Sequence, residues 1–170
     1  MEQLRYLINL LLIVLVSETV STVSFGGALS TSEVSRVEVV LANQYRSRES
    51  ELKKEFAQAG LVNVHFQFAR MGRPPQNIGL GREVPADKAR EAIRLARKYN
   101  VGVTILLPER LFPSRFITIA SSNYDDTVEY PITQETLENL GDPGLTTEGF
   151  HRLYRALTSG VRHSKGRSSW

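Results

Sequence analysis

Side chains that could take part in catalysis or metal binding are few in this chain of 170 residues. The three histidines, His65, His151 and His163, lie far apart and not at the short spacings that are typical of metal ligands. The chain contains no cysteine, which excludes disulfides, thiolate ligands and thiol catalysis. We therefore predict no catalytic residue, no metal site and no cofactor.

One segment supports a hydrolase as an alternative. The run Ser121-Ser122-Asn123 is followed by Asp125 and Asp126, so a hydroxyl nucleophile and carboxylates come close together in sequence. The G-x-S-x-G turn that exposes the nucleophile in α/β-hydrolases is missing, and the same residue types are typical of a turn after a strand. We interpret this segment first as a turn.

A segment that occurs twice in the sequence predicts the strands and helices that would position any functional site. Residues 39–68 and 78–107 each show the pattern strand, helix, strand, at an offset of about 39 residues. The apolar positions of the two copies align as Val39, Leu41, Phe66 and Phe68 with Ile78, Leu80, Ile105 and Leu107. Such a duplication predicts two β-α-β units.

The individual elements are predicted from periodicity and from helix and turn signals. Strands are expected at 36–43, 62–68, 78–81, 101–107 and 116–121, and helices at 47–59, 86–99, 133–140 and 147–157. Ser47, or Ser50 in competition with it, is expected to cap the first helix, and Gly60 to end it. The second strand is expected to place Val62, Val64, Phe66 and Phe68 on its core face and Asn63, His65 and Gln67 on the other.

These elements predict an α+β fold. Two β-α-β units form a ferredoxin-like or RNP-like sheet with the helices on one face, extended by one further strand and the C-terminal helices. A doubly wound α/β sheet is the alternative, although the polar face of the second strand argues against it. We expect one α+β domain at 35–158, a separate segment at 1–30 and a flexible basic tail at 159–170.

The first thirty residues have the features of a targeting segment. The apolar run Tyr6–Val16 has the length of a signal-peptide core, and the small residues Gly26-Gly27-Ala28 follow at plausible cleavage positions. We expect a signal peptide or, if it is not cleaved, a membrane anchor; a buried N-terminal helix is the alternative. The protein is accordingly expected to be exported to the periplasm or cell envelope.

Charge is distributed unevenly along the chain. Residues 35–122 contain 15 Lys and Arg against 8 Asp and Glu, whereas residues 123–151 contain seven acids and no Lys or Arg. The acidic stretch is therefore expected to fold back over a basic face, and a surface for an anionic partner is the alternative. The basic surface consists of Arg90, Arg94, Arg97 and Lys98 on one helix.

The order of elements resembles that of the SPOR family over about residues 36–108. The resemblance rests on the strand starts VEVVLANQY and IGLG, each followed by a helix and a strand. SPOR domains are envelope domains with tandem β-α-β repeats that bind peptidoglycan glycan strands, so the resemblance implies binding through the open sheet face. The polar residues predicted on that face, as the ligand-binding set, are Asn63, His65, Gln67 and Thr104.

We therefore expect a non-catalytic, envelope-exposed binding domain for a cell-wall polymer such as glycan. A protein–protein assembly module of the envelope, with an envelope protein as partner, is the first alternative, and an RNA-binding or hydrolase domain is the second. Nucleic acid is not expected as a partner, because Phe66 and Phe68, the aromatic residues of the second strand, are predicted on the core face rather than exposed for base stacking.

Overall fold

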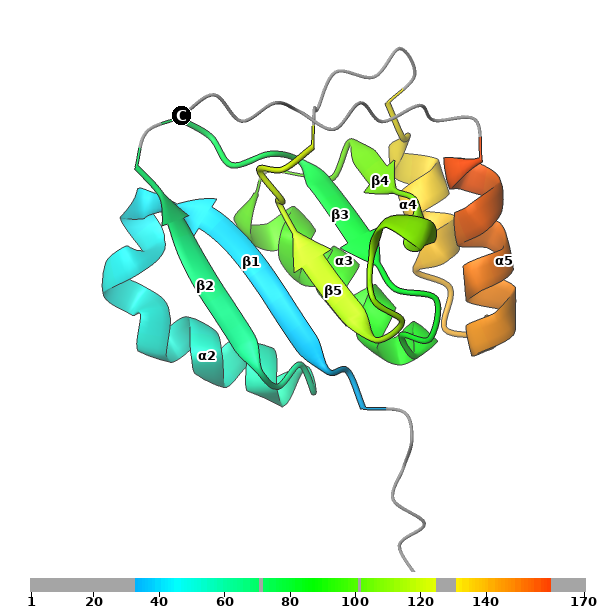
Figure 1. Cartoon of the computed structure of the whole chain (residues 1–170), viewed down its shortest axis with the longest axis horizontal. Helices are drawn as coiled ribbons and strands as arrows, with labels where there is room; N and C mark the ends of the chain where they lie inside the picture. Colours follow the sequence, from blue (N-terminus) through cyan, green and yellow to red (C-terminus); the bar gives the residue numbers. More distant parts are fainter. Residues whose placement is uncertain (1–32, 71, 101, 125–130, 160–170) are drawn as a thin grey trace, which may run out of the picture. The chain divides into compact units, whose positions relative to one another are not determined.

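The computed structural model describes residues 33–70, 72–100, 102–124 and 131–159. The targeting segment predicted at 1–30 and the tail from residue 160 onward lie outside the described residues. The described part forms a five-stranded mixed sheet with four α-helices (Figure 1), which confirms the predicted α+β class. The strands are β1 (Arg36–Ala42), β2 (Val64–Ala69), β3 (Asn77–Leu80), β4 (Ile105–Leu107) and β5 (Phe116–Ile119); the helices are α2 (Glu49–Gln58), α3 (Ala86–Tyr99), α4 (Gln134–Leu140) and α5 (Thr147–Thr158), with 3-10 helices η1 (Asn43–Arg48) and η2 (Glu109–Leu111).

The strand order is β2-β1-β5-β3-β4. Strands β1 and β2 pair in parallel around α2, and β3 and β4 pair in parallel around α3, so both predicted β-α-β units are present. Strand β5 lies between the units, parallel to β1 and antiparallel to β3. The ferredoxin-like detail is not confirmed, because the strands of one unit do not interleave with those of the other; β5 takes the central place instead.

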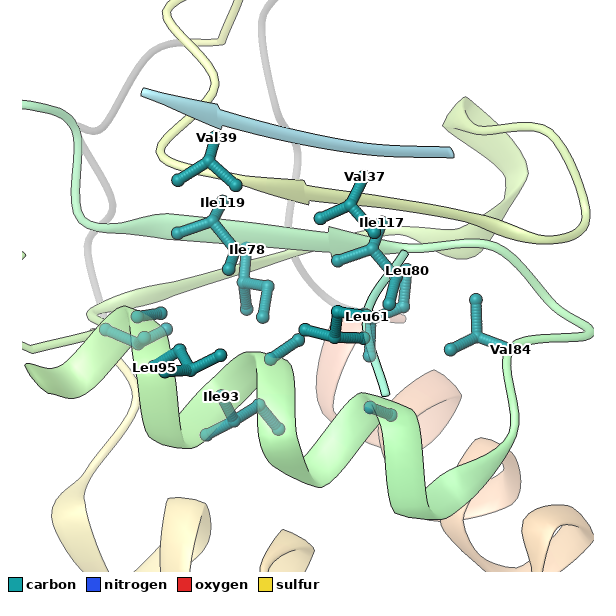
Figure 2. Packing of buried hydrophobic residues seen from close by; sticks show 14 of the residues in the cluster. Val37, Val39, Leu61, Ile78, Leu80, Val84, Ile93, Leu95, Ile117 and Ile119 are labelled. Atoms are coloured by element: carbon teal, nitrogen blue, oxygen red, sulfur yellow. The ribbon is translucent and has the colours of Figure 1, made fainter. Parts of the chain in front are cut away.

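The main core lies between one face of the sheet and the helices. Side chains of β1, β5 and β3 point toward α3, whose Leu95 lies on the side of the helix that faces the sheet (Figure 2). Ala89, Ala92 and Ala96 are buried on the same helix, and their small size lets α3 lie close to the strands. The sheet residues that form this contact are Val37, Val39, Ile78, Leu80, Ile117 and Ile119.

Two details of the first unit differ from the prediction. Val62 is 37% exposed and lies before β2, because Asn63 has a φ of 55° and turns the chain there. Neither Ser47 nor Ser50 caps α2; the chain enters the helix directly from η1, with Arg48 at the N-cap and no side-chain hydrogen bond. The left-handed conformation predicted for Gly60 is confirmed by its φ of 72°.

The alignment of the two copies is wrong by one residue in the second strand. Val39 pairs with Phe66, but Ile78 pairs with Leu106 rather than with Ile105. A shift of one residue exchanges the faces of a strand, so Ile105 and Leu107 point away from the main core. Both are nevertheless buried, because β4 is covered on its two sides, and apolar residues therefore occur in either phase.

Two glycines allow a loop to cross the other face of the sheet. A Cβ at Gly79 would lie 2.3 Å from Phe112 Cε2, and a Cβ at Gly81 would lie 1.9 Å from the carbonyl oxygen of Pro113. The loop is tied down by hydrogen bonds from the Gly81 amide to Phe116 O (2.8 Å) and from the Glu83 amide to Ser114 O (2.7 Å). The half of the sheet around β3 is thereby covered on both faces.

Candidate functional site

The open part of the sheet lies on β1 and β2, on the face opposite the helices. His65 and Gln67 of β2 are exposed there, beside Glu38 and Val40 of β1 in the parallel register. Thr118 of β5, which lies on the other side of Glu38, is only 2% exposed. We call Glu38, Val40, His65 and Gln67 the open face.

The structure brings together two of the four residues predicted to bind ligand. His65 and Gln67 share the open face, whereas Asn63 lies in the turn before β2, where its carbonyl accepts a hydrogen bond from the Val37 amide (3.2 Å). Thr104 precedes β4, at the opposite edge of the sheet from β2. Four strand spacings, about 19 Å, separate the two edges. Thr104 therefore lies apart from His65 and Gln67, and its hydroxyl donates to Gln76 O at 3.3 Å.

A group of three aromatic residues borders the open face. Phe116 is adjacent to Arg36 in the β1–β5 register, which places it on the same face as Glu38. Phe112 stacks on Phe116 with ring centroids 5.9 Å apart, and Tyr124 packs edge-on against Phe112 at 5.7 Å. All three are partly exposed. We call Phe112, Phe116 and Tyr124 the aromatic wall; sequence reasoning missed it because only Phe116 lies in an element with a readable period.

The position of Tyr124 depends on a buried asparagine. Asn77 is 1% exposed, its side-chain amide donates to Ser121 O (2.9 Å), and its Oδ1 accepts from the Ser121 amide (2.8 Å). The chain turns sharply just before, at Ala120, whose φ is 60°. Desolvation raises the pKa of the Tyr124 phenol, so this hydroxyl remains a donor at neutral pH.

The four basic residues predicted on α3 have different surroundings. Arg90 donates to the carbonyl oxygens of Asp142 (3.2 Å) and Leu145 (3.3 Å). The acidic stretch at 123–151 therefore does contact α3, but through backbone carbonyls rather than through its carboxylates. Arg94 pairs with Glu91 on its own helix at 2.8 Å. Lys98 pairs with Glu55 of α2 at 2.8 Å, and Arg97 makes no ion pair or hydrogen bond with the described residues. The surface is therefore only partly available to a partner.

Glu55 joins α2 to the end of α3. Its carboxylate accepts hydrogen bonds from Lys98 (2.8 Å) and from the Tyr99 hydroxyl. Desolvation of the carboxyl raises its pKa, but the two hydrogen bonds outweigh that effect and hold the pKa of Glu55 below its ordinary value. Burial, together with the bond to Glu55, raises the pKa of Tyr99.

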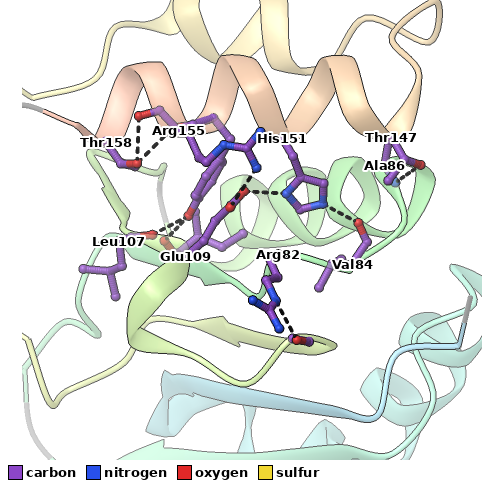
Figure 3. A network of polar contacts seen from close by, with 12 residues as sticks. Arg82, Val84, Ala86, Leu107, Glu109, Thr147, His151, Arg155 and Thr158 are labelled. Atoms are coloured by element: carbon purple, nitrogen blue, oxygen red, sulfur yellow. Dashed lines mark hydrogen bonds and ion pairs between the residues drawn. The ribbon is translucent and has the colours of Figure 1, made fainter.

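A buried polar network joins α5 to the loops around β3 and β4 (Figure 3). His151, 3% exposed, lies with Nδ1 2.5 Å from Glu109 Oε1 and Nε2 2.7 Å from the carbonyl oxygen of Val84. Arg155 contacts the other oxygen of Glu109 at 3.3 Å. A carbonyl can only accept, so Nε2 donates, and both ring nitrogens are engaged. The His151 side chain therefore attaches α5 to the loops that contain Glu109 and Val84, and this arrangement suits a structural role better than that of a general base.

An open pocket of about 760 Å³ lies next to this network. Three arginines line it, Arg82 after β3, Arg110 in η2 and Arg155 on α5, and Glu109 is the one carboxylate among the described residues that line it. The remaining lining includes the hydroxyls of Ser114, Thr158 and Ser159 and the ring of Phe112. We call this cavity the arginine pocket. None of its residues was among the predicted sites, since the three arginines come from distant segments.

The hydrolase segment is only partly described. Ser121 is 8% exposed, and its hydroxyl oxygen accepts a hydrogen bond from the Asn123 amide at 3.4 Å. Asp125 and Asp126 lie outside the described residues. Among the residues that the structure does describe, no three or more metal-ligating side chains gather into a group that could hold an ion.

The described helices and the comparisons with known proteins complete the survey. Within the described ranges, no helix combines the length and the apolar character needed to cross a membrane. No protein-family model, curated protein or solved structure matches this chain.

Proposed function

We propose that this protein is a non-catalytic binding domain of the cell envelope that holds a cell-wall polymer, such as glycan, on its open face. One observation carries the proposal: the polar open face and the aromatic wall lie side by side on the uncovered side of one sheet. The resemblance to SPOR domains supports glycan as the ligand of this face.

The chemistry of a glycan suits this combination. A sugar ring offers an apolar C–H face and a rim of hydroxyls. The rings of Phe116 and Phe112 supply flat apolar area for the first, and His65, Gln67 and Glu38 supply donors and acceptors for the second. Strands β2 and β5 lie two spacings apart, about 10 Å, so a chain of sugars can contact both groups at once.

The surroundings of the candidate catalytic groups support a binding role. His151 uses both ring nitrogens in structural hydrogen bonds, and Ser121 is held in a turn by Asn77. Neither side chain is presented to the open face. The domain is therefore better built to hold a polymer than to cleave one.

Co-sedimentation with purified cell-wall sacculi tests the proposal. The full-length protein should pellet with sacculi, and the variant His65→Ala/Gln67→Ala should bind about tenfold more weakly, as expected for the loss of one or two hydrogen bonds at about 1.4 kcal/mol per tenfold. Phe116→Ala should weaken binding to a similar extent. Gln58→Ala, an exposed change on α2, is the matched control and should bind like the wild type.

Two results would refute glycan binding at this face. In the first, the wild type stays in the supernatant with sacculi. In the second, the wild type and His65→Ala/Gln67→Ala pellet equally. If the protein instead binds single-stranded RNA, and this binding weakens steeply as the salt concentration rises, the aromatic wall would be assigned to the stacking of RNA bases.

Assembly with an envelope protein is the second candidate, because β2 is an edge strand with little protection. Val64–Ala69 contains no charged residue and no proline, the residues that usually prevent an edge from pairing with another strand. A partner could add an extended segment there by main-chain hydrogen bonds. Such a protein would co-purify with a stoichiometric partner, and that association would be unaffected by sacculi.

A further inference from the structure

The charged side chains that line the arginine pocket are mainly cationic. Of its charged side chains, Arg82, Arg110 and Arg155 are cationic and Glu109 is anionic. The Glu109 carboxylate is already engaged, since one of its oxygens contacts His151 at 2.5 Å and the other contacts Arg155 at 3.3 Å. The pocket therefore has no carboxylate left to balance Arg82 and Arg110.

The guanidinium groups keep donors available. Arg82 donates through Nε to Ser114 Oγ (3.1 Å) and lies 3.7 Å from Glu83, with 72% of its side chain exposed. Arg110 has no ion pair or hydrogen bond within the described ranges, and the Arg155 side chain is 55% exposed. A guanidinium has five N–H donors, so these contacts occupy a small part of the donor capacity. In Figure 3 the Arg155 guanidinium is joined to Glu109, whereas the dashed line from Arg82 leads away from Glu109 to the Ser114 hydroxyl.

We propose that the arginine pocket binds a phosphate group, either the free dianion or a phosphate ester. A carboxylate has two oxygens in one plane and suits one guanidinium, whereas a tetrahedral phosphate has enough acceptors for arginines that approach from three segments. The Ser114 hydroxyl accepts from Arg82 and so keeps its own proton for an anion. The pocket is open to solvent on one side, which leaves room for the rest of an ester.

This inference does not depend on glycan binding. Among the residues of the open face and the aromatic wall, only Phe112 also lines the arginine pocket. Loss of phosphate binding and loss of sacculus binding are therefore separable by mutation.

The test is isothermal titration of the full-length protein with inorganic phosphate at constant ionic strength. The wild type should bind one equivalent in a saturable manner. Arg82→Gln and Arg110→Gln should each weaken binding by about tenfold, the effect of losing one charge-assisted hydrogen bond. Arg48→Gln, which removes an exposed arginine outside the pocket that pairs with Glu51, is the matched control and should bind like the wild type. Arg155→Gln is less suitable, because Arg155 also contacts buried Glu109.

Absence of saturable binding would overturn the proposal. So would an equal loss in Arg48→Gln, which would indicate unspecific attraction to a basic protein, or binding of acetate as tight as that of phosphate. Competition by phenyl phosphate separates the two sources of the group: displacement of inorganic phosphate supports a phosphate ester as ligand, and exclusion of phenyl phosphate supports the free ion.

Discussion

On α5, the His151 ring lies 2.5 Å and the Arg155 guanidinium 3.3 Å from the Glu109 carboxylate, although the Glu109 side chain is only 7% exposed. Moving a carboxylate out of water costs several kcal/mol, and close partners must offset that cost. The His151 ring is held on its other side by the Val84 carbonyl. These contacts connect α5 to the chain after β3 and after β4, and the wall of the arginine pocket rests on them.

Glu109→Ala should destabilise the domain by roughly 1–3 kcal/mol, because it leaves the buried His151 Nδ1 without its hydrogen-bond partner. Urea unfolding at pH 7 measures the change. Glu83→Ala, which removes only exposed ion pairs with Arg82 and Arg115, should alter stability by less than about 1 kcal/mol. Equal effects of the two substitutions would show that Glu109 is not a buried anchor.

Glu55→Gln should remove a pH-dependent part of the stability. A carboxyl whose folded-state pKa is lowered stabilises the fold above its ordinary pKa, here 4.5, and this contribution is lost as the pH falls through the lower folded value. The wild type should therefore lose more stability than Glu55→Gln between pH 6 and about pH 3. At neutral pH the variant should be less stable by roughly 1 kcal/mol, since the pair with Lys98 is partly exposed. Parallel urea curves for the two proteins over this range would contradict the assignment.

The bounds of helices and strands with a clear apolar periodicity were predictable from the sequence. The position of an element in the sheet was not, where contacts between distant segments determine it. Helix α3 has the predicted bounds, because Pro85 precedes it and its alanines repeat at helical spacing. Strand β5 was expected at 116–121, but nothing in its residues indicates that it lies between β1 and β3. The polar pattern of β2 correctly placed His65 and Gln67 on one exposed face.

The aromatic wall was beyond sequence reasoning for a related reason. Phe112 and Tyr124 lie in irregular segments, and their contacts depend on where the loop after β4 crosses the sheet. That crossing requires Gly79 and Gly81, whose residue type in the sequence could equally indicate a turn or a phosphate loop. The register of β4 was misassigned because a strand buried on both faces has no apolar alternation to read.

Gly81→Ala should disrupt the crossing of the 112–114 loop. The added Cβ would lie 1.9 Å from Pro113 O and 2.5 Å from Ser114 O, both backbone atoms, so the loop must move. We expect a loss of stability of roughly 2 kcal/mol or more, in the range of overpacking substitutions, together with a change in the near-ultraviolet signal of the aromatic wall. Gly149→Ala in α5 is the control; its Cβ would lie 3.3 Å from Thr146 Oγ1, a side-chain atom that needs to give by only a few tenths of an ångström, and alanine favours a helix, so its stability should change far less than that of Gly81→Ala. A stable Gly81→Ala protein with unchanged aromatic signals would contradict this packing.

For the molecule as a whole, the sheet divides into a half covered on both faces and a half covered on one. The helices and the 112–114 loop enclose β3 and β5, whereas β1 and β2 keep one face open. The open face belongs to the half that is covered on one face, and the aromatic wall lies at its border, whereas the arginine pocket lies beside α5 at the half that is covered on both faces. The proposed glycan site and the proposed phosphate site therefore occupy different parts of the domain.

Export of the protein is a further prediction at this scale. With a C-terminal tag on the full-length chain, the tag should be digested by protease only after the outer envelope is opened, and a cleaved product should begin near Leu29. A protein that stays cytosolic with Met1 intact would contradict an envelope function.

The most direct measurement of the central proposal is an NMR titration of the protein with soluble glycan strands freed of peptides. We predict that the backbone amides of His65, Gln67 and Phe116 shift together and saturate with one constant, while those of α3 and α4 stay in place. Shifts that fall on the helices, or no shift at all at saturating glycan, would contradict binding at the open face.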